Sequence, residues 1–175
     1  MTTPHVPTDA PAQALAATGE HTTKGVPHGY SSLTPFLPLT DPDGALGFYR
    51  EVFGARTVNE TRMGDVVVHA EIEFEHGRLQ LGAATPEYRT RANDPDSEDV
   101  SFSLGLYCPD VDATVERALA AGAVLREPVT TFVSGDRFGS IRDPFGVRWS
   151  VMTRVEDLSD AESDARVQAW AAEQG

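Results

Sequence analysis

Ionisable side chains alternate along one predicted strand, which spans residues 66–75. His69, Glu71 and Glu73 occupy every second position, and strand alternation sends them to one face while the apolar residues between them face the other way. Together they could supply a general base, hold a metal ion, or bind a cationic group. An ordinary hydrated cleft or a subunit seam would carry the same residues, so the pattern alone leaves these interpretations open.

Other chemistry has less support in the sequence. Cys108 lies in an apolar strand pattern, which favours a packed thiol over a nucleophile. Phosphate-binding glycine loops, a serine elbow and a Cys/His pair at nucleophile spacing are missing from the 175 residues. The net charge of −13 argues against nucleic acid and against anionic membranes as partners. We expect a cytoplasmic protein, since a lone cysteine fits a reducing compartment and neither a membrane span nor a secretory signal is evident.

Hydrophobic periodicity predicts the elements that position the ionisable strand. In the first half they are a strand at 32–40, a helix at 43–54, a strand at 55–60 and a hairpin of 66–75 with 78–83. In the second half they are a strand at 100–108, a helix at 110–121, a strand at 124–127 and a hairpin at 135–151. The repeated order of strand, helix and three strands predicts an internal duplication.

The predicted domain organisation places one domain between two terminal segments. Residues 1–27 form a flexible arm with at most a helical turn at 13–17. The domain spans 28–157, with module one at 30–87, a linker at 88–99 and module two at 100–157. A helical tail occupies 158–175, opened by a capping-box pattern at 159–162.

Several motifs resemble those of a known family. They are Phe-Tyr-Arg-Glu-Val-Phe-Gly-Ala at 48–55, His-Ala-Glu-Ile at 69–72, Val-Asp-Ala at 111–113, Gly-Asp-Arg-Phe-Gly at 135–139, Arg-Asp-Pro-Phe-Gly at 142–146, Trp-Ser at 149–150 and Val-Glu-Asp-Leu-Ser at 155–159. The chain resembles the vicinal oxygen chelate superfamily, which includes glyoxalase I, bleomycin-resistance proteins, fosfomycin-resistance enzymes and extradiol dioxygenases. It is most similar to the PhnB-like branch. The resemblance implies an α+β fold in which two βαβββ modules form a curled mixed sheet, an open barrel or cup with the helices outside. It also implies a homodimer.

The resemblance also implies four positions for metal ligands. Thr34 and Ser103 fall on the first strands of the two modules, and Gln80 and Ser150 fall on the last strands. The family's metal enzymes usually carry His or Glu at these places. Neutral oxygen donors are poor ligands for a catalytic first-row metal, so we expect neither a metal at this site nor another cofactor.

A binding protein is the first functional hypothesis. By register with the family, the inward-facing set adds Phe36, Tyr107, Arg148 and Met152, and hairpin pairing is expected to place Glu73 near the candidate ligand at position 80. An apolar and aromatic lining with a few polar anchors suits a small organic ligand. The hypothesis is therefore a cationic or drug-like molecule bound without metal, as in antibiotic resistance. The acidic side chains would attract it, the aromatic rings would stack on it, and Thr34 and its polar neighbours would orient it.

Two alternatives remain at this point. The protein could be an isomerase, lyase or cyclase in which His69 or Glu71 is the general base, or a divalent-metal enzyme that uses this pair as relocated ligands. An interaction module that works through the arm and the tail is a third hypothesis.

Overall fold

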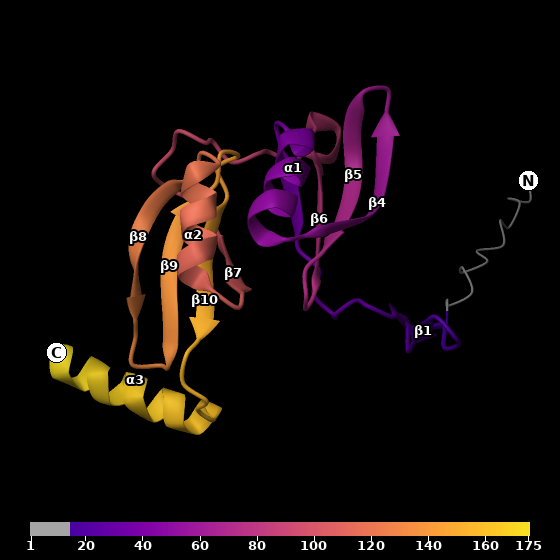
Figure 1. Ribbon diagram of the computed structural model, residues 1–175. Helices are drawn as coiled ribbons and strands as arrows, with labels where there is room; N and C mark the ends of the chain where they lie inside the picture. The colour runs from indigo at the N-terminus through magenta and orange to yellow at the C-terminus, as the bar shows by residue number, and fades with distance from the viewer. Residues whose placement is uncertain (1–14) are drawn as a thin grey trace, which may run out of the picture.

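The computed structural model describes residues 15–175 and contains two four-stranded sheets, each accompanied by a helix (Figure 1). The first module comprises β3 (Phe36–Leu39), α1 (Pro42–Phe53), β4 (Arg56–Met63), β5 (Val66–Glu73) and β6 (Arg78–Ala83). The second comprises β7 (Ser103–Tyr107), α2 (Val111–Ala120), β8 (Val124–Thr131), β9 (Asp136–Arg142) and β10 (Arg148–Arg154). The predicted α+β fold of two βαβββ modules is confirmed.

The two sheets share one topology. Their strand orders are β3-β6-β5-β4 and β7-β10-β9-β8, and in each the first strand of the module pairs in parallel with the last. The remaining pairs are antiparallel. The sheets curl without closing into a barrel. The predicted repeat of strand, helix and three strands is confirmed.

Aspartates cap the start of the helix in each module, Asp41 for α1 and Asp110 for α2. Asp41 accepts a hydrogen bond from the backbone nitrogen of Gly44 at 2.9 Å, so α1 starts at Pro42, one residue before the predicted start. Gly54 ends this helix in the left-handed region, with φ of 70°. In α2, Val111, Val115 and Ala118 are buried, whereas Leu119 is 38% exposed.

The first strand is shorter than predicted, because its partner limits it. Strand β6 begins only at Arg78, and its pairing with the first strand starts at Gln80, which pairs with Phe36 and donates its backbone nitrogen to the Pro35 carbonyl. Strand β3 therefore begins at Phe36, and Thr34 lies before it. In contrast, the strands after the two helices run farther than predicted, to Met63 and to residue 131.

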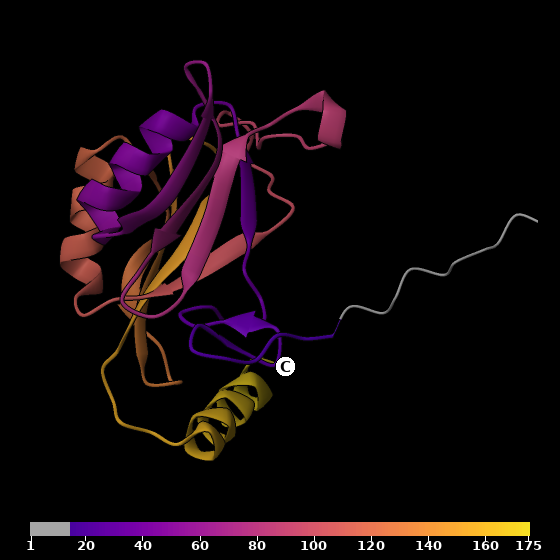
Figure 2. The same cartoon turned by 90° about the vertical axis from the view of Figure 1, so that its right-hand side faces the viewer.

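One core joins the modules. The rings of Tyr49 and Phe53 in α1 contact Trp149 of β10 at centroid distances of 5.4 and 4.8 Å. The Tyr49 hydroxyl also donates to Asp143 at 2.8 Å. Viewed from the side, α1 and α2 lie on one side of the sheets, and the segment with the short helix η1 (Pro86–Tyr88) projects on the other (Figure 2). The opposite faces of the sheets carry no such helix in the part of the chain that the structure describes, so a ligand can reach the sheets there. We call these the free faces.

The remaining elements lie outside the two modules. They are β1 (Thr22–Thr23), β2 (Val26–Pro27), η1 (Pro86–Tyr88) and α3 (Asp160–Gln174). The capping box at Ser159 and Glu162 is confirmed. The predicted helical turn at 13–17 lies partly outside the described residues, and 15–17 are not helical. Among residues 15–175, none of the helices is long and apolar enough to cross a membrane.

Candidate functional site

The predicted ionisable strand is β5. Ala70 and Ile72 are buried in the core on the α1 side. His69, Glu71 and Glu73 project from the opposite face, as the alternation predicted, and contact side chains from other strands of the same sheet there. The candidate site is built on this free face of the first module.

The register of the hairpin differs from the prediction by two residues. We expected Glu73 near Gln80, but Glu71 lies opposite Gln80 and Glu73 lies opposite Arg78. The turn occupies positions 74–77, closed by a hydrogen bond from the Phe74 nitrogen to the residue 77 carbonyl, so pairing resumes at Arg78. The carboxylate that meets the Gln80 amide is therefore that of Glu71.

Glu71 is buried and saturated with hydrogen bonds. The residue is 6% exposed, and its carboxylate accepts from the Tyr30 hydroxyl, from Asn59 Nδ2 at 2.8 Å and from Gln80 Nε2 at 2.9 Å. Burial alone would raise the pKa of Glu71, but these hydrogen bonds outweigh it and hold the pKa below its ordinary value. We call Glu71, Asn59 and Gln80 the polar anchor. A carboxylate held this way is a weak base, which weakens the case for Glu71 as a general base.

Glu73 has its charge offset by two arginines. Arg78 donates from Nε and Nη2 at 3.1 and 3.0 Å, and Arg56 forms a second ion pair with the same carboxylate. Arg78, then Arg56, lowers the pKa of Glu73. Because its charge is already offset, Glu73 offers little of the predicted attraction to a cationic ligand.

Tyr30 joins the site from the N-terminal segment. Its hydroxyl donates to Glu71, and its ring lies 4.4 Å from the guanidinium carbon of Arg78. Sequence reasoning missed this residue, because it lies 41 positions from Glu71 in a polar stretch without periodicity. No local signal in the sequence could have placed it here.

A recess of about 720 Å³ adjoins the polar anchor on the same face. It is lined by Phe36, Met63, Val66, Val68, His69, Ala83, Ala84, Thr85, Glu87, Tyr88 and Thr90. The rings of Phe36 and His69 stack at 6.2 Å, and Phe36 is the strand partner of Gln80 in the anchor. A volume of this size is typical of sites for small organic molecules.

The predicted site residues of module two form a separate group. Ser103, Arg148, Ser150, Met152 and Tyr107 share the free face of the second sheet by register. Within that group, Arg148 donates to the Ser140 hydroxyl at 3.0 Å and pairs with Glu127. None of these residues lines the recess of module one, so the structure does not bring the two predicted groups into one cavity.

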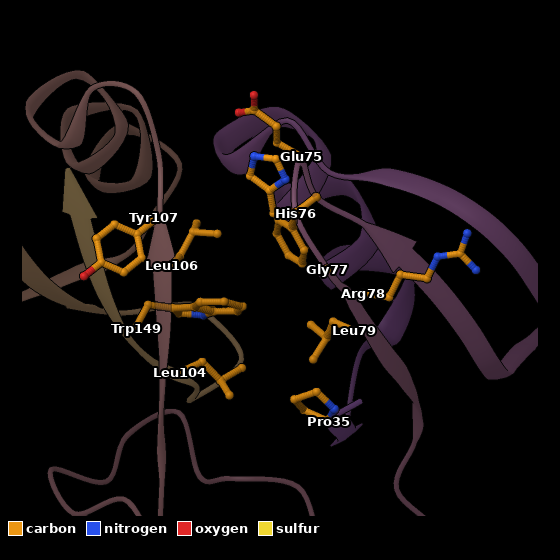
Figure 3. Close-up of a pocket in the computed structure, with 12 residues that line it drawn as sticks. Pro35, Glu75, His76, Gly77, Arg78, Leu79, Leu104, Leu106, Tyr107 and Trp149 are labelled. Atoms are coloured by element: carbon orange, nitrogen blue, oxygen red, sulfur yellow. The ribbon is translucent and has the colours of Figure 1, made fainter. Parts of the chain in front are cut away.

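A second cavity, of about 380 Å³, lies between the modules (Figure 3). Leu104, Leu106, Tyr107 and Trp149 face it from the second module, and the β5–β6 turn faces it from the first. Tyr107 is the one predicted site residue among those that line it.

The donor set does not fit a catalytic metal. Thr34, Ser103 and Ser150 offer neutral hydroxyls, and the Gln80 amide already donates to Glu71. Within the described part of the chain, no group of three or more His, Cys, Asp or Glu is placed to hold a metal ion. A relocated site through His69 and Glu71 would lack a third ligand of these types, so the chemistry proposed below is not routed through a metal.

Three comparisons place the chain among known proteins. Protein Rv0887c of Mycobacterium tuberculosis is 29% identical over 137 residues, which cover 77% of this chain and 81% of that protein. The crystal structure of TioX from Micromonospora sp. ML1 aligns with a TM-score of 0.56 and 22% identity, covering 74% of this chain and all of that one. A PhnB protein from Bacillus cereus aligns with a TM-score of 0.54 and 19% identity, covering 70% and 99% of the two chains.

A family model supplies the remaining finding. The model of the Glyoxalase/Bleomycin resistance protein/Dioxygenase superfamily matches residues 21–151, a range that runs from the N-terminal segment to β10. The repeated modules and these matches agree, and the chain belongs to the glyoxalase, bleomycin resistance protein and dioxygenase superfamily.

Proposed function

We propose that the protein binds a small organic molecule on the free face of its first module. The apolar body of the ligand lies in the recess against Phe36 and His69, and a polar group meets the polar anchor. The observation that carries the proposal is the recess of about 720 Å³ beside a buried, hydrogen-bonded carboxylate. Bleomycin resistance proteins share the family, which supports a drug-like ligand.

Binding is better supported than catalysis. Glu71 is held as an acceptor by three donors, and an effective base at neutral pH needs a pKa raised toward that value. His69 lines the recess and stacks on Phe36. Its role as a general base in an isomerase, lyase or cyclase stays a prediction. Replacing it by Gln would abolish turnover of a substrate but only weaken binding of a ligand.

Titration calorimetry against a panel of aromatic drug-like compounds, bleomycin included, tests the proposal. We expect at least one compound to bind saturably, and Phe36→Ala to weaken it by about tenfold because a stacking ring is lost. Tyr107→Ala is the matched control, since it removes an aromatic ring from the free face of the other module. Saturable binding to no compound, or a loss with Tyr107→Ala but not with Phe36→Ala, would contradict the proposal.

A further inference from the structure

The N-terminal segment folds back onto the site. Residues 19–30, which we call the strap, contain the β1–β2 hairpin, in which Thr22 pairs with Pro27 and Thr23 with Val26. The strap ends at Tyr30, whose side chain lies at the polar anchor. The chain thus supplies a side chain from before the first strand of module one to the centre of its own candidate site.

The contact between strap and site is close. Gly29 has a φ of +88°, and a Cβ built on it would lie 2.8 Å from Arg78 Nη2. Arg78 is held by Glu73 on one side and lies over the Tyr30 ring on the other. The fit depends on a glycine before the tyrosine, because a side chain there would be strained and would push Arg78 away.

The contacts of Tyr30 indicate which chemical group the polar anchor can bind. A buried carboxylate, fixed by two side-chain amides, accepts the hydroxyl. A guanidinium covers the ring. An aromatic hydrocarbon would leave the Glu71 carboxylate without one of its donors, and an ammonium group would meet the positive charge of Arg78. Of these groups, an aromatic ring that bears a hydroxyl satisfies both contacts.

We propose that Tyr30 is an internal occupant of a phenol-binding site, and that the ligand is a small molecule whose phenolic ring displaces it. The inference rests on the proposed function and names the chemical class of the ligand. With the phenol at Glu71, the rest of the molecule reaches Phe36, because Phe36 pairs with the anchor residue Gln80. The strap opens as the ligand binds.

Removing the internal occupant gives the first test. The variant Tyr30→Ala leaves the place of the Tyr30 ring empty. p-Cresol, which has the structure of the tyrosine side chain, should bind there. We expect p-cresol to bind at least about tenfold more tightly than 4-methylanisole, its O-methyl ether, because only the phenol donates to a charged acceptor. The preference should disappear in Tyr30→Ala/Glu71→Gln. Equal affinity for the two compounds in Tyr30→Ala, or an undiminished preference in the double variant, would overturn the inference.

The unmodified protein gives the second test, because Lys24 in the strap hairpin is the only lysine of the chain. A lysine-specific protease therefore cuts once, after the exposed Lys24, and the cut should be faster when the strap leaves the polar anchor, because the segment around the cleavage site is then less ordered. We expect p-cresol to accelerate this cut at saturating concentration and 4-methylanisole to leave it unchanged. Tyr30→Phe and Gly29→Ala should be cut faster without any ligand.

The outcomes separate this inference from the proposed function. If ligands bind the recess in a Phe36-dependent way but phenols neither bind Tyr30→Ala selectively nor accelerate the cut, the inference fails and the proposed function stands. If phenols do both while Phe36→Ala has no effect on any ligand, the phenol site stands and the recess is not the binding site.

Discussion

Glu71 is a carboxylate whose surroundings keep it charged at neutral pH although it is buried. Three neutral donors offset the loss of water, and no arginine makes a hydrogen bond to it in the described chain. The contrast with Glu73 is direct, because that carboxylate, two residues away, is neutralised by Arg56 and Arg78. The two carboxylates of β5 therefore differ in chemistry. Glu71 accepts hydrogen bonds from neutral donors, whereas Glu73 forms ion pairs with two arginines.

Glu71→Gln should destabilise the protein at pH 7 by about 1–3 kcal/mol, because a charged acceptor of three hydrogen bonds is replaced. The folded pKa of Glu71 is depressed, so its contribution is present above the ordinary value of 4.5 and is lost as the pH falls through the folded pKa. Urea unfolding should therefore show a gap between variant and unmodified protein that narrows below pH 4.5.

Glu116→Gln is the control for that measurement. Glu116 is exposed on α2, and we expect its replacement to change the free energy of unfolding by less than about 0.5 kcal/mol. A gap for Glu71→Gln that does not depend on pH would contradict the assignment of Glu71 as the titrating group.

At the scale of elements, the β9–β10 turn connects the two modules through hydrogen bonds of Asp143. Asp143 Oδ1 accepts from the backbone nitrogens of Phe145 and Val147 at 2.9 Å, and Oδ2 accepts from Tyr49 of α1 and from Trp149 Nε1. Burial raises the pKa of Asp143, although all four hydrogen bonds oppose that rise. A turn that the sequence marks only by Pro and Gly is thus also a contact between the modules.

Asp143→Asn should destabilise the fold by about 2 kcal/mol, because an amide nitrogen cannot accept from the Trp149 indole. Thermal unfolding by circular dichroism measures the effect. Asp157→Asn, at an exposed position between β10 and α3, provides the comparison and should leave the melting temperature unchanged. Equal melting temperatures for the two variants would show that the buried hydrogen bonds contribute little.

The backbones of β5 and β6 approach each other closely at Gly82, which gives a second prediction at the scale of elements. A Cβ at Gly82 of β6 would lie 2.2 Å from the Val68 carbonyl oxygen of β5, a contact with backbone that cannot move aside. Gly82→Ala should therefore cost about 1–3 kcal/mol of stability in urea unfolding. Gly47→Ala in α1 meets nothing within 4 Å and should stabilise the helix by about 0.5–1 kcal/mol. A Gly82→Ala variant as stable as the unmodified protein would show that β5 and β6 can separate without cost.

The whole molecule presents both sheets with their free faces uncovered by helices (Figure 2). Large apolar side chains are exposed, including Met63 at 73%, Tyr88 at 76% and Tyr107 at 58%. Exposed apolar surface of this kind is typical of association sites. The homodimer expected from the family resemblance stays a prediction that this surface supports.

We expect sedimentation velocity to detect a dimer whose population rises with protein concentration. Each chain has a net charge of −13, so two copies repel each other and added salt should favour the dimer by screening that repulsion. A monomer at all concentrations and salt levels would contradict the prediction.

The sequence by itself determined the order of elements and the faces of its strands. Side-chain periods of 2.0 and 3.6 residues are local properties. They sufficed to place His69, Glu71 and Glu73 on one face of β5. The repeat of strand, helix and three strands, together with the motifs, was enough for the fold.

Only the tertiary structure decided which residues meet across the chain. The hydrogen bond from Tyr30 to Glu71 spans 41 positions, and that from Tyr49 to Asp143 spans 94. The division of the predicted site into two separate groups has the same origin. Such contacts depend on how whole elements pack, and neither periodicity nor turn chemistry carries information about the distance between segments so far apart along the chain.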